Sequence, residues 1–300
     1  MTANRWGRGL LAITLVLAGL GAGCKSTYSK GAVSQAISDI CEKEYGVRVG
    51  VQTGENTVSV FLPAANVLKN DMSFSDHVLD KIEHVMLTAT RVTLSSEMKY
   101  DFFVLTTRDS RTGVEIAFVR YIKDIRRLIT DDISRTDFFQ RMLIEVKRVD
   151  PAAPPQFKNY RLQDFLASQL AERLRQDLSL NVVAGRLFHL VDLEGAYVVV
   201  PAPQRHLLPT AVFRITLLFH PDAPPFETMG TSALRDDFSR LFLHTAQIVT
   251  RRYDFRAFDG LELVDRTGRR LAYFDRKEFN RDSVSTLMEL IRSLKDKTKE

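Results

Sequence analysis

Two histidines and an aspartate stand at spacings that could hold a metal ion. His77, Asp80 and His84 occupy positions i, i+3 and i+7 of an expected helix, so their side chains share one face. Imidazole nitrogens and a carboxylate oxygen together suit a divalent metal. This face lies opposite the apolar stripe of the same helix, and the pattern offers no fourth ligand. A solvated polar face is the simpler interpretation, so we expect no metal and no other cofactor.

A repeated turn is the second candidate. Arg111-Thr112-Gly113 recurs as Arg266-Thr267-Gly268, each time between two expected strands. Twin anion-binding loops are one interpretation of this repeat. Hairpin chemistry is the simpler one, because glycine permits a positive φ and the arginine and threonine face solvent.

The motifs of the common enzyme classes are absent from the sequence. It contains no glycine-rich nucleotide-binding loop, no Gly-x-Ser-x-Gly elbow, no His-Glu-x-x-His and no Cys-x-x-Cys. We therefore assign no catalytic residue.

The first 23 residues have the pattern of a signal peptide. Arg5 and Arg8 precede an uncharged run from Gly9 to Gly23. That run has the length of a signal-peptide core and is shorter than the roughly 20 apolar residues that span a bilayer. It ends in small residues directly before Cys24. The pattern predicts export, with residues 1–23 removed.

This N-terminus resembles that of the bacterial lipoprotein class. Ala22-Gly23 matches the two small residues that precede the cysteine in that class, whereas Gly21 stands where the class prefers an aliphatic residue. The resemblance covers residues 1–24 and implies that the Cys24 thiol carries a diacylglyceryl group. Two or three acyl chains hold a protein stably at a bilayer. Lys25, in place of the aspartate of inner-membrane lipoproteins, implies the outer membrane and a periplasm-facing protein.

Cys41 is the second cysteine of the chain. It shares an apolar stripe at helical spacing with Val33, Ile37 and Ile40, which predicts a buried thiol. A reactive thiol, or one that pairs between chains, is the alternative.

Four segments recur in the same order in the two halves of the chain, which predicts an internal duplication. The pairs are Ser34-Gln35 with Ser168-Gln169, Val60 to Ala64 with Val198 to Ala202, Thr88-Ala89 with Thr245-Ala246, and Tyr100 to Phe118 with Tyr253 to Tyr273. The expected order is a lipidated tether (24–31), a first repeat (32–148), a proline-rich linker (149–160) and a second repeat (161–300).

Each repeat combines helices with hairpins of alternating strands. We expect a helix from Ser134 to about Val146, a strand from Ala211 to Phe219 that is extra to the second repeat, and a closing helix from about Arg281 to Lys295. Hairpins joined by helices give antiparallel sheets with helices packed on one face. The predicted fold class is α+β, in two similar lobes.

Composition limits the function. The 300 residues carry 42 Lys+Arg and 37 Asp+Glu, a net charge of +5 that falls to +3 when Arg5 and Arg8 leave with the signal peptide. So small an excess does not favour nucleic acid as a partner. We expect a membrane-anchored envelope lipoprotein that acts as a non-enzymatic binding or assembly module. Its partners would be the bilayer, through Cys24, and an envelope protein. The alternative is an envelope enzyme with a site between the two lobes.

Overall fold

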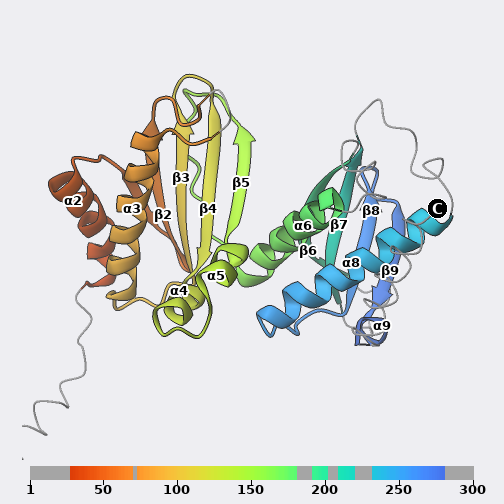
Figure 1. Ribbon diagram of the computed structural model, residues 1–300. Helices are drawn as coiled ribbons and strands as arrows, with labels where there is room; N and C mark the ends of the chain where they lie inside the picture. Colours follow the sequence, from red (N-terminus) through yellow and green to blue (C-terminus); the bar gives the residue numbers. More distant parts are fainter. Residues whose placement is uncertain (1–27, 70–72, 181–190, 202–208, 220–231, 281–300) are drawn as a thin grey trace, which may run out of the picture. The chain divides into compact units, whose positions relative to one another are not determined.

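The protein consists of two compact units with an α+β fold, as predicted. The computed structural model describes residues 28–69, 73–180, 191–201, 209–219 and 232–280. The first unit comprises Met1–Asp132 and Ile144–Asn159, and the second comprises Ile133–Leu143 and Tyr160–Glu300 (Figure 1). The signal peptide, Cys24 and the closing helix expected near residues 281–295 lie outside the described residues.

The first unit is built around a five-stranded sheet of order β1-β2-β3-β4-β5. Its elements are η1 (Lys30–Ala32), α2 (Val33–Tyr45), β1 (Gly50–Thr53), β2 (Thr57–Ala64), α3 (Asp76–Leu94), β3 (Phe102–Asp109), β4 (Val114–Tyr121), α4 (Ile122–Ile129) and β5 (Leu143–Arg148). The hairpins β1–β2 and β3–β4 are antiparallel, as expected, but β2 and β3 pair in parallel. A parallel pair needs a crossover connection, and α3 supplies it.

The second unit repeats this order with a four-stranded sheet, β6-β7-β8-β9. Its elements are α5 (Arg135–Arg141), α6 (Leu162–Leu180), β6 (Val191–Val200), β7 (Thr210–Phe219), α8 (Ser232–Arg252), β8 (Gly260–Asp265), β9 (Arg270–Asp275) and α9 (Arg276–Asn280). Here β7 and β8 form the parallel pair, across α8. The two units therefore share one order of helices and strands.

This order corrects the position of the supposed extra strand. By topology β6 is the counterpart of β1, and β7 is the counterpart of β2. The strand at 210–219 is therefore part of the repeat. The sequence match between residues 60–64 and residues 198–202 therefore pairs β2 with β6, which are not equivalent strands. Short runs of valine are common in strands of any position, so such a match does not identify equivalent strands.

The helix expected from Ser134 to about Val146 was too long. The Ser134 cap is confirmed, since its hydroxyl accepts the Asp137 backbone N–H at 3.0 Å. The helix ends at Arg141, however, and β5 follows. Ile144 and Val146 are exposed at alternate positions of this strand. Such β-branched residues favour a strand over a further helical turn.

An apolar core holds α2 and α3 against the first sheet. Ile37, Cys41, Val85 and Ala89 on the facing sides of these helices are all 0% exposed. Full burial of each larger aliphatic side chain stabilises the fold by about 1.5–3 kcal/mol. The burial of Cys41 confirms its assignment to the core.

The proline-rich segment packs onto the first sheet. Consecutive residues of β3 from Phe102 to Leu105 are buried, so both faces of this sheet are covered. Residues 149–159 belong to the first unit, and the Asn159 side chain accepts the Asn56 N–H at 3.2 Å. The Arg108 guanidinium donates to the carbonyl oxygen of Ala153. The segment is thus a strap that contributes to the cover of the sheet.

A buried ion pair lies beneath this strap. The side chains of Arg108 and Glu115 are 5% and 3% exposed, with Nη2 and Oε2 2.5 Å apart, and Lys147 Nζ lies 3.0 Å from Glu115 Oε1. The three side chains come from β3, β4 and β5. Because a buried charge is costly without its partner, this cluster fixes the pairing of the three strands.

The second sheet is covered on one face by α6 and α8, which lie side by side (Figure 1). Phe213, Ile215 and Leu217 of β7 are at most 1% exposed, whereas Arg214 and Thr216 between them are half-buried. At Gly195 the backbone of α6 comes so close to β6 that an added Cβ atom would lie 1.9 Å from the Ala167 carbonyl oxygen. This packing sets the position of the end of α8, where the pocket described below lies.

Candidate functional site

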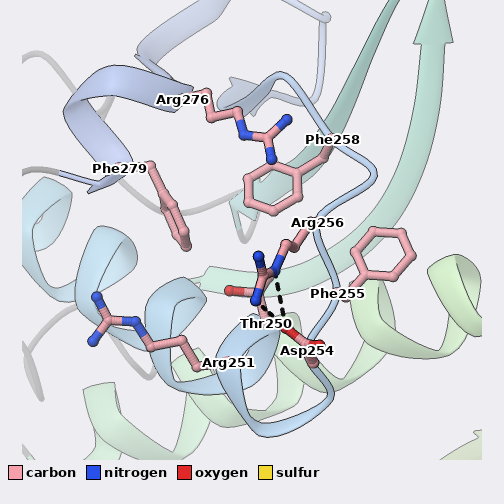
Figure 2. A pocket seen from close by; sticks show the side chains of 8 residues that line it. All are labelled: Thr250, Arg251, Asp254, Phe255, Arg256, Phe258, Arg276 and Phe279. Atoms are coloured by element: carbon pink, nitrogen blue, oxygen red, sulfur yellow. Dashed lines mark hydrogen bonds and ion pairs between the residues drawn. The ribbon is translucent and has the colours of Figure 1, made fainter.

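A pocket opens where α8 ends, and it lies wholly within the second unit. Its volume is about 330 Å³. Eight side chains line it, from the last turn of α8, the loop to β8, and α9 (Figure 2). They are Thr250, Arg251, Asp254, Phe255, Arg256, Phe258, Arg276 and Phe279.

A left-handed residue ends α8 and directs the chain around the pocket. Asp254 has φ 47°, a conformation that aspartate tolerates better than most residues. Its N–H donates to the Arg251 carbonyl at 3.1 Å, and the Phe255 N–H donates to the Thr250 carbonyl at 2.9 Å. These bonds satisfy carbonyls that a helix end otherwise leaves without partners. The turn brings Phe255 and Arg256 to the pocket wall.

Aromatic rings form the apolar part of the pocket. Phe258 and Phe279 are 3% and 6% exposed and meet edge to face with centroids 5.1 Å apart. Phe255 is half-buried, and its ring lies parallel to that of Phe258 within 6° at 6.4 Å. Phe213 of β7 contacts both of these rings from the core, at 5.6 and 5.3 Å. The rings are therefore held rigidly by the sheet beneath them.

Guanidinium groups form the charged part. Arg251, Arg256 and Arg276 line the pocket with one carboxylate, that of Asp254, so its formal charge is positive. Arg256 Nη2 lies 2.9 Å from Asp254 Oδ1, and both side chains are largely exposed. Arg276 is exposed and has no hydrogen-bond or ion-pair partner among the residues that the structure describes. Guanidinium groups stay protonated and bind carboxylates and phosphates with paired N–H donors, so this arrangement suits an anion.

The metal candidate does not form a site. His77 and Asp80 are exposed on α3, whereas the His84 ring stacks on Tyr45 of α2 at 4.3 Å and 13°. Within the described ranges, no group of three or more His, Cys, Asp or Glu residues could hold a metal ion. The polar face of α3 is thus an ordinary helix surface with one histidine packed on a neighbour.

The twin turns are hairpin turns, and each supplies its own anion. Gly113 and Gly268 have φ 70° and 83°, as a turn glycine should. The Asp109 carboxylate accepts the N–H groups of Arg111 and Thr112 at 2.8 and 3.1 Å. In the second unit the Asp265 carboxylate accepts the N–H groups of Thr267 and Arg269. Aspartates of the protein therefore occupy the donors that a bound anion would need.

These turn hydrogen bonds also set the ionisation of Asp109. Burial by itself raises the pKa of Asp109, but N–H groups of Arg111, Thr112 and Val67 outweigh it, so the pKa is lowered. The carboxylate stays charged and locks the turn.

The sequence interpretation missed the pocket. It assigned no role to Arg251, which lies in the last turn of α8 and lines the pocket. The signal that could have found it is arginine spaced closely to phenylalanine, in Phe255-Arg256-Ala257-Phe258 and again in Arg276-Lys277-Glu278-Phe279. Only pairing of β8 with β9 brings these two segments together.

Comparisons with protein-family models, with curated proteins and with solved structures find no match for this chain. Among the described helices, none has the length and hydropathy to cross a bilayer.

Proposed function

We propose that this protein is a lipid-anchored envelope protein that binds a partner without acting on it chemically. The acyl chains on Cys24 would hold it at the outer membrane, facing the periplasm. The resemblance of residues 1–24 to bacterial lipoproteins supports the anchor, and Lys25 supports the outer membrane. The partner that we propose is another protein of the envelope.

The composition of the pocket is the observation that carries the binding role. Its polar groups are three guanidinium groups, the Thr250 hydroxyl and the Asp254 carboxylate. A guanidinium group is a poor general acid because it keeps its proton far above neutral pH. The Asp254 carboxylate pairs with Arg256, and the Thr250 hydroxyl donates to the Ala246 carbonyl at 2.8 Å. Fixed charges beside rigid rings recognise and hold a group, which is what a binding module needs.

Palmitate labelling tests the anchor. Cells that express the wild-type chain, Cys24→Ser or Cys41→Ser are labelled with a palmitate analogue, and the protein is purified. We expect label on the wild type and on Cys41→Ser, but none on Cys24→Ser, because Cys41 is buried in the core. Equal labelling of the wild type and Cys24→Ser would overturn the lipid anchor.

Photo-crosslinking in cells tests the partner. A photoreactive residue is placed at Lys277, which is exposed next to the pocket residue Arg276, or at Lys43, which is exposed on α2 of the first unit. We expect a discrete protein adduct, recovered in the membrane fraction, from position 277 and none of that size from position 43. The same adducts from both positions, or none from position 277, would contradict binding at this pocket.

A further inference from the structure

We infer that the pocket at the end of α8 binds a ligand that carries a carboxylate or phosphate group close to an aromatic ring. This inference rests on the proposed binding role and names the chemistry that the pocket recognises.

The charges of the pocket select for the anionic group. The N–H groups of Asp254 and Phe255 cap two carbonyls of the last turn of α8, which reduces the negative potential of that helix end. The Asp254 carboxylate is held by Nε and Nη2 of Arg256, at 3.0 and 2.9 Å. The Arg276 guanidinium, from α9 on another side of the pocket, has no such carboxylate among the described residues. An anionic ligand would supply the missing partner of the Arg276 guanidinium.

The aromatic rings select for the apolar group. Phe258 and Phe279 are fixed by burial and by edge-to-face contact, so an incoming ring meets a preformed surface at little entropic cost. Phe255 presents a half-exposed ring beside Arg256, which is its neighbour in the chain. Apolar surface and positive charge therefore lie within one residue of each other, as a ligand with an anion next to a ring requires.

The size of the pocket limits the ligand. Its 330 Å³ is at the lower end of the roughly 300–1,000 Å³ that small-molecule sites occupy. One ring with one anionic group fits such a volume, and a dinucleotide does not. Both a small aryl phosphate ester and an aromatic residue at the end of a protein chain, with its free carboxylate, have this chemistry.

Isothermal titration of the full mature chain in detergent tests the inference with simple probes. Phenyl phosphate represents the ester, and N-acetyl-phenylalanine represents a chain end. Inorganic phosphate and phenol each carry half of the proposed ligand. We expect at least one of the two complete probes to bind about tenfold more tightly than either half, because charge and ring contacts act together. The tighter of the two complete probes identifies the source of the ligand.

Matched variants locate the site. Arg276→Gln should weaken binding of the complete probe by about tenfold, since it removes a charge-assisted hydrogen bond. Arg266→Gln removes the same charge from the β8–β9 turn, away from the pocket lining, and should leave the affinity unchanged. Phe255→Ala should weaken phenyl phosphate while leaving inorganic phosphate unaffected.

Two results would overturn the inference. One is the absence of binding by both complete probes at millimolar concentration, with circular dichroism showing a folded protein. The other is an equal loss of affinity in Arg276→Gln and Arg266→Gln, which would indicate unspecific attraction to positive charge. Neither result touches the palmitate labelling or the crosslinks at position 277, so the failure of this inference is distinguishable from failure of the proposed function.

Discussion

The close contact of α6 with β6 at Gly195 allows a quantitative prediction of how the substitution Gly195→Ala changes the stability of the second unit. A Cβ atom added at Gly195 would lie 1.9 Å from the Ala167 carbonyl oxygen and 2.6 Å from its carbonyl carbon. Both are backbone atoms of α6, so no side chain can rotate away to relieve the overlap. The backbone angle φ of Gly195 is not positive, so Gly195→Ala adds no backbone strain and its cost is one of space.

The cost follows from the distance that α6 must move. Real Cβ atoms essentially never come closer than 3.0 Å to another heavy atom, so the helix must retreat by about 1 Å over this residue. Overpacking of a filled core costs about 1–3 kcal/mol. Because a rigid helix has to move as a body and opens space around Phe165 and Leu166, we expect a loss of about 3 kcal/mol in the free energy of unfolding.

Gly50 is the matched control. It lies in β1, the counterpart of β6 in the first unit, and its added Cβ would come no closer than 3.8 Å, to Phe61 Cβ. Gly50→Ala should leave stability unchanged or raise it by about 0.4–1 kcal/mol. Urea unfolding followed by circular dichroism gives both values. A Gly195→Ala protein as stable as the wild type, or as stable as Gly50→Ala, would refute the close packing of α6 on β6.

Two further predictions concern ionisable groups. Burial by itself raises the pKa of Glu262, but hydrogen bonds from Arg214 and Arg270 outweigh it and lower the pKa below its value in the unfolded chain. The charged carboxylate therefore stabilises the fold at any pH above the unfolded pKa. This stabilisation is lost as the pH falls through the folded pKa. Glu262→Gln should therefore lower the free energy of unfolding by about 1–2 kcal/mol at neutral pH. Urea unfolding at several pH values should also show that its stability falls less steeply on the acid side than that of the wild type. An equally steep fall in both proteins would contradict this prediction. Burial raises the pKa of the Cys41 thiol to about 11, so about one molecule in a thousand carries the thiolate at pH 8. In Cys24→Ser protein, Cys41 should react with a thiol reagent orders of magnitude faster in urea than in buffer; equal rates would show that the thiol is accessible in the folded protein.

The two units share some features and differ in others. Asp109 and Asp265 close equivalent turns at the ends of β3 and β8, with a glycine in the same left-handed conformation four and three residues on, respectively. The strap and β5 belong to the first unit. The pocket belongs to the second, where Asp254 takes a positive φ after the end of α8.

Local patterns in the sequence determined much of the fold. The helical spacing of Ile37 and Cys41 predicts a buried stripe, and both side chains are fully buried. The Ser134 cap and the turn at Gly113 follow from the chemistry of single residues, which needs no distant partner. These features are decided within about four residues of the chain, so the sequence shows them directly.

The tertiary structure decided what depends on partners far along the chain. The strand from Leu143 to Arg148 takes its place beside β4, where Lys147 meets Glu115. The strap lies on the first sheet because Arg108 and Asn56 bind Ala153 and Asn159. The pocket forms because pairing of β8 with β9 carries α9 back to the end of α8. Contacts of this kind depend on register and packing between distant segments, which no local pattern encodes.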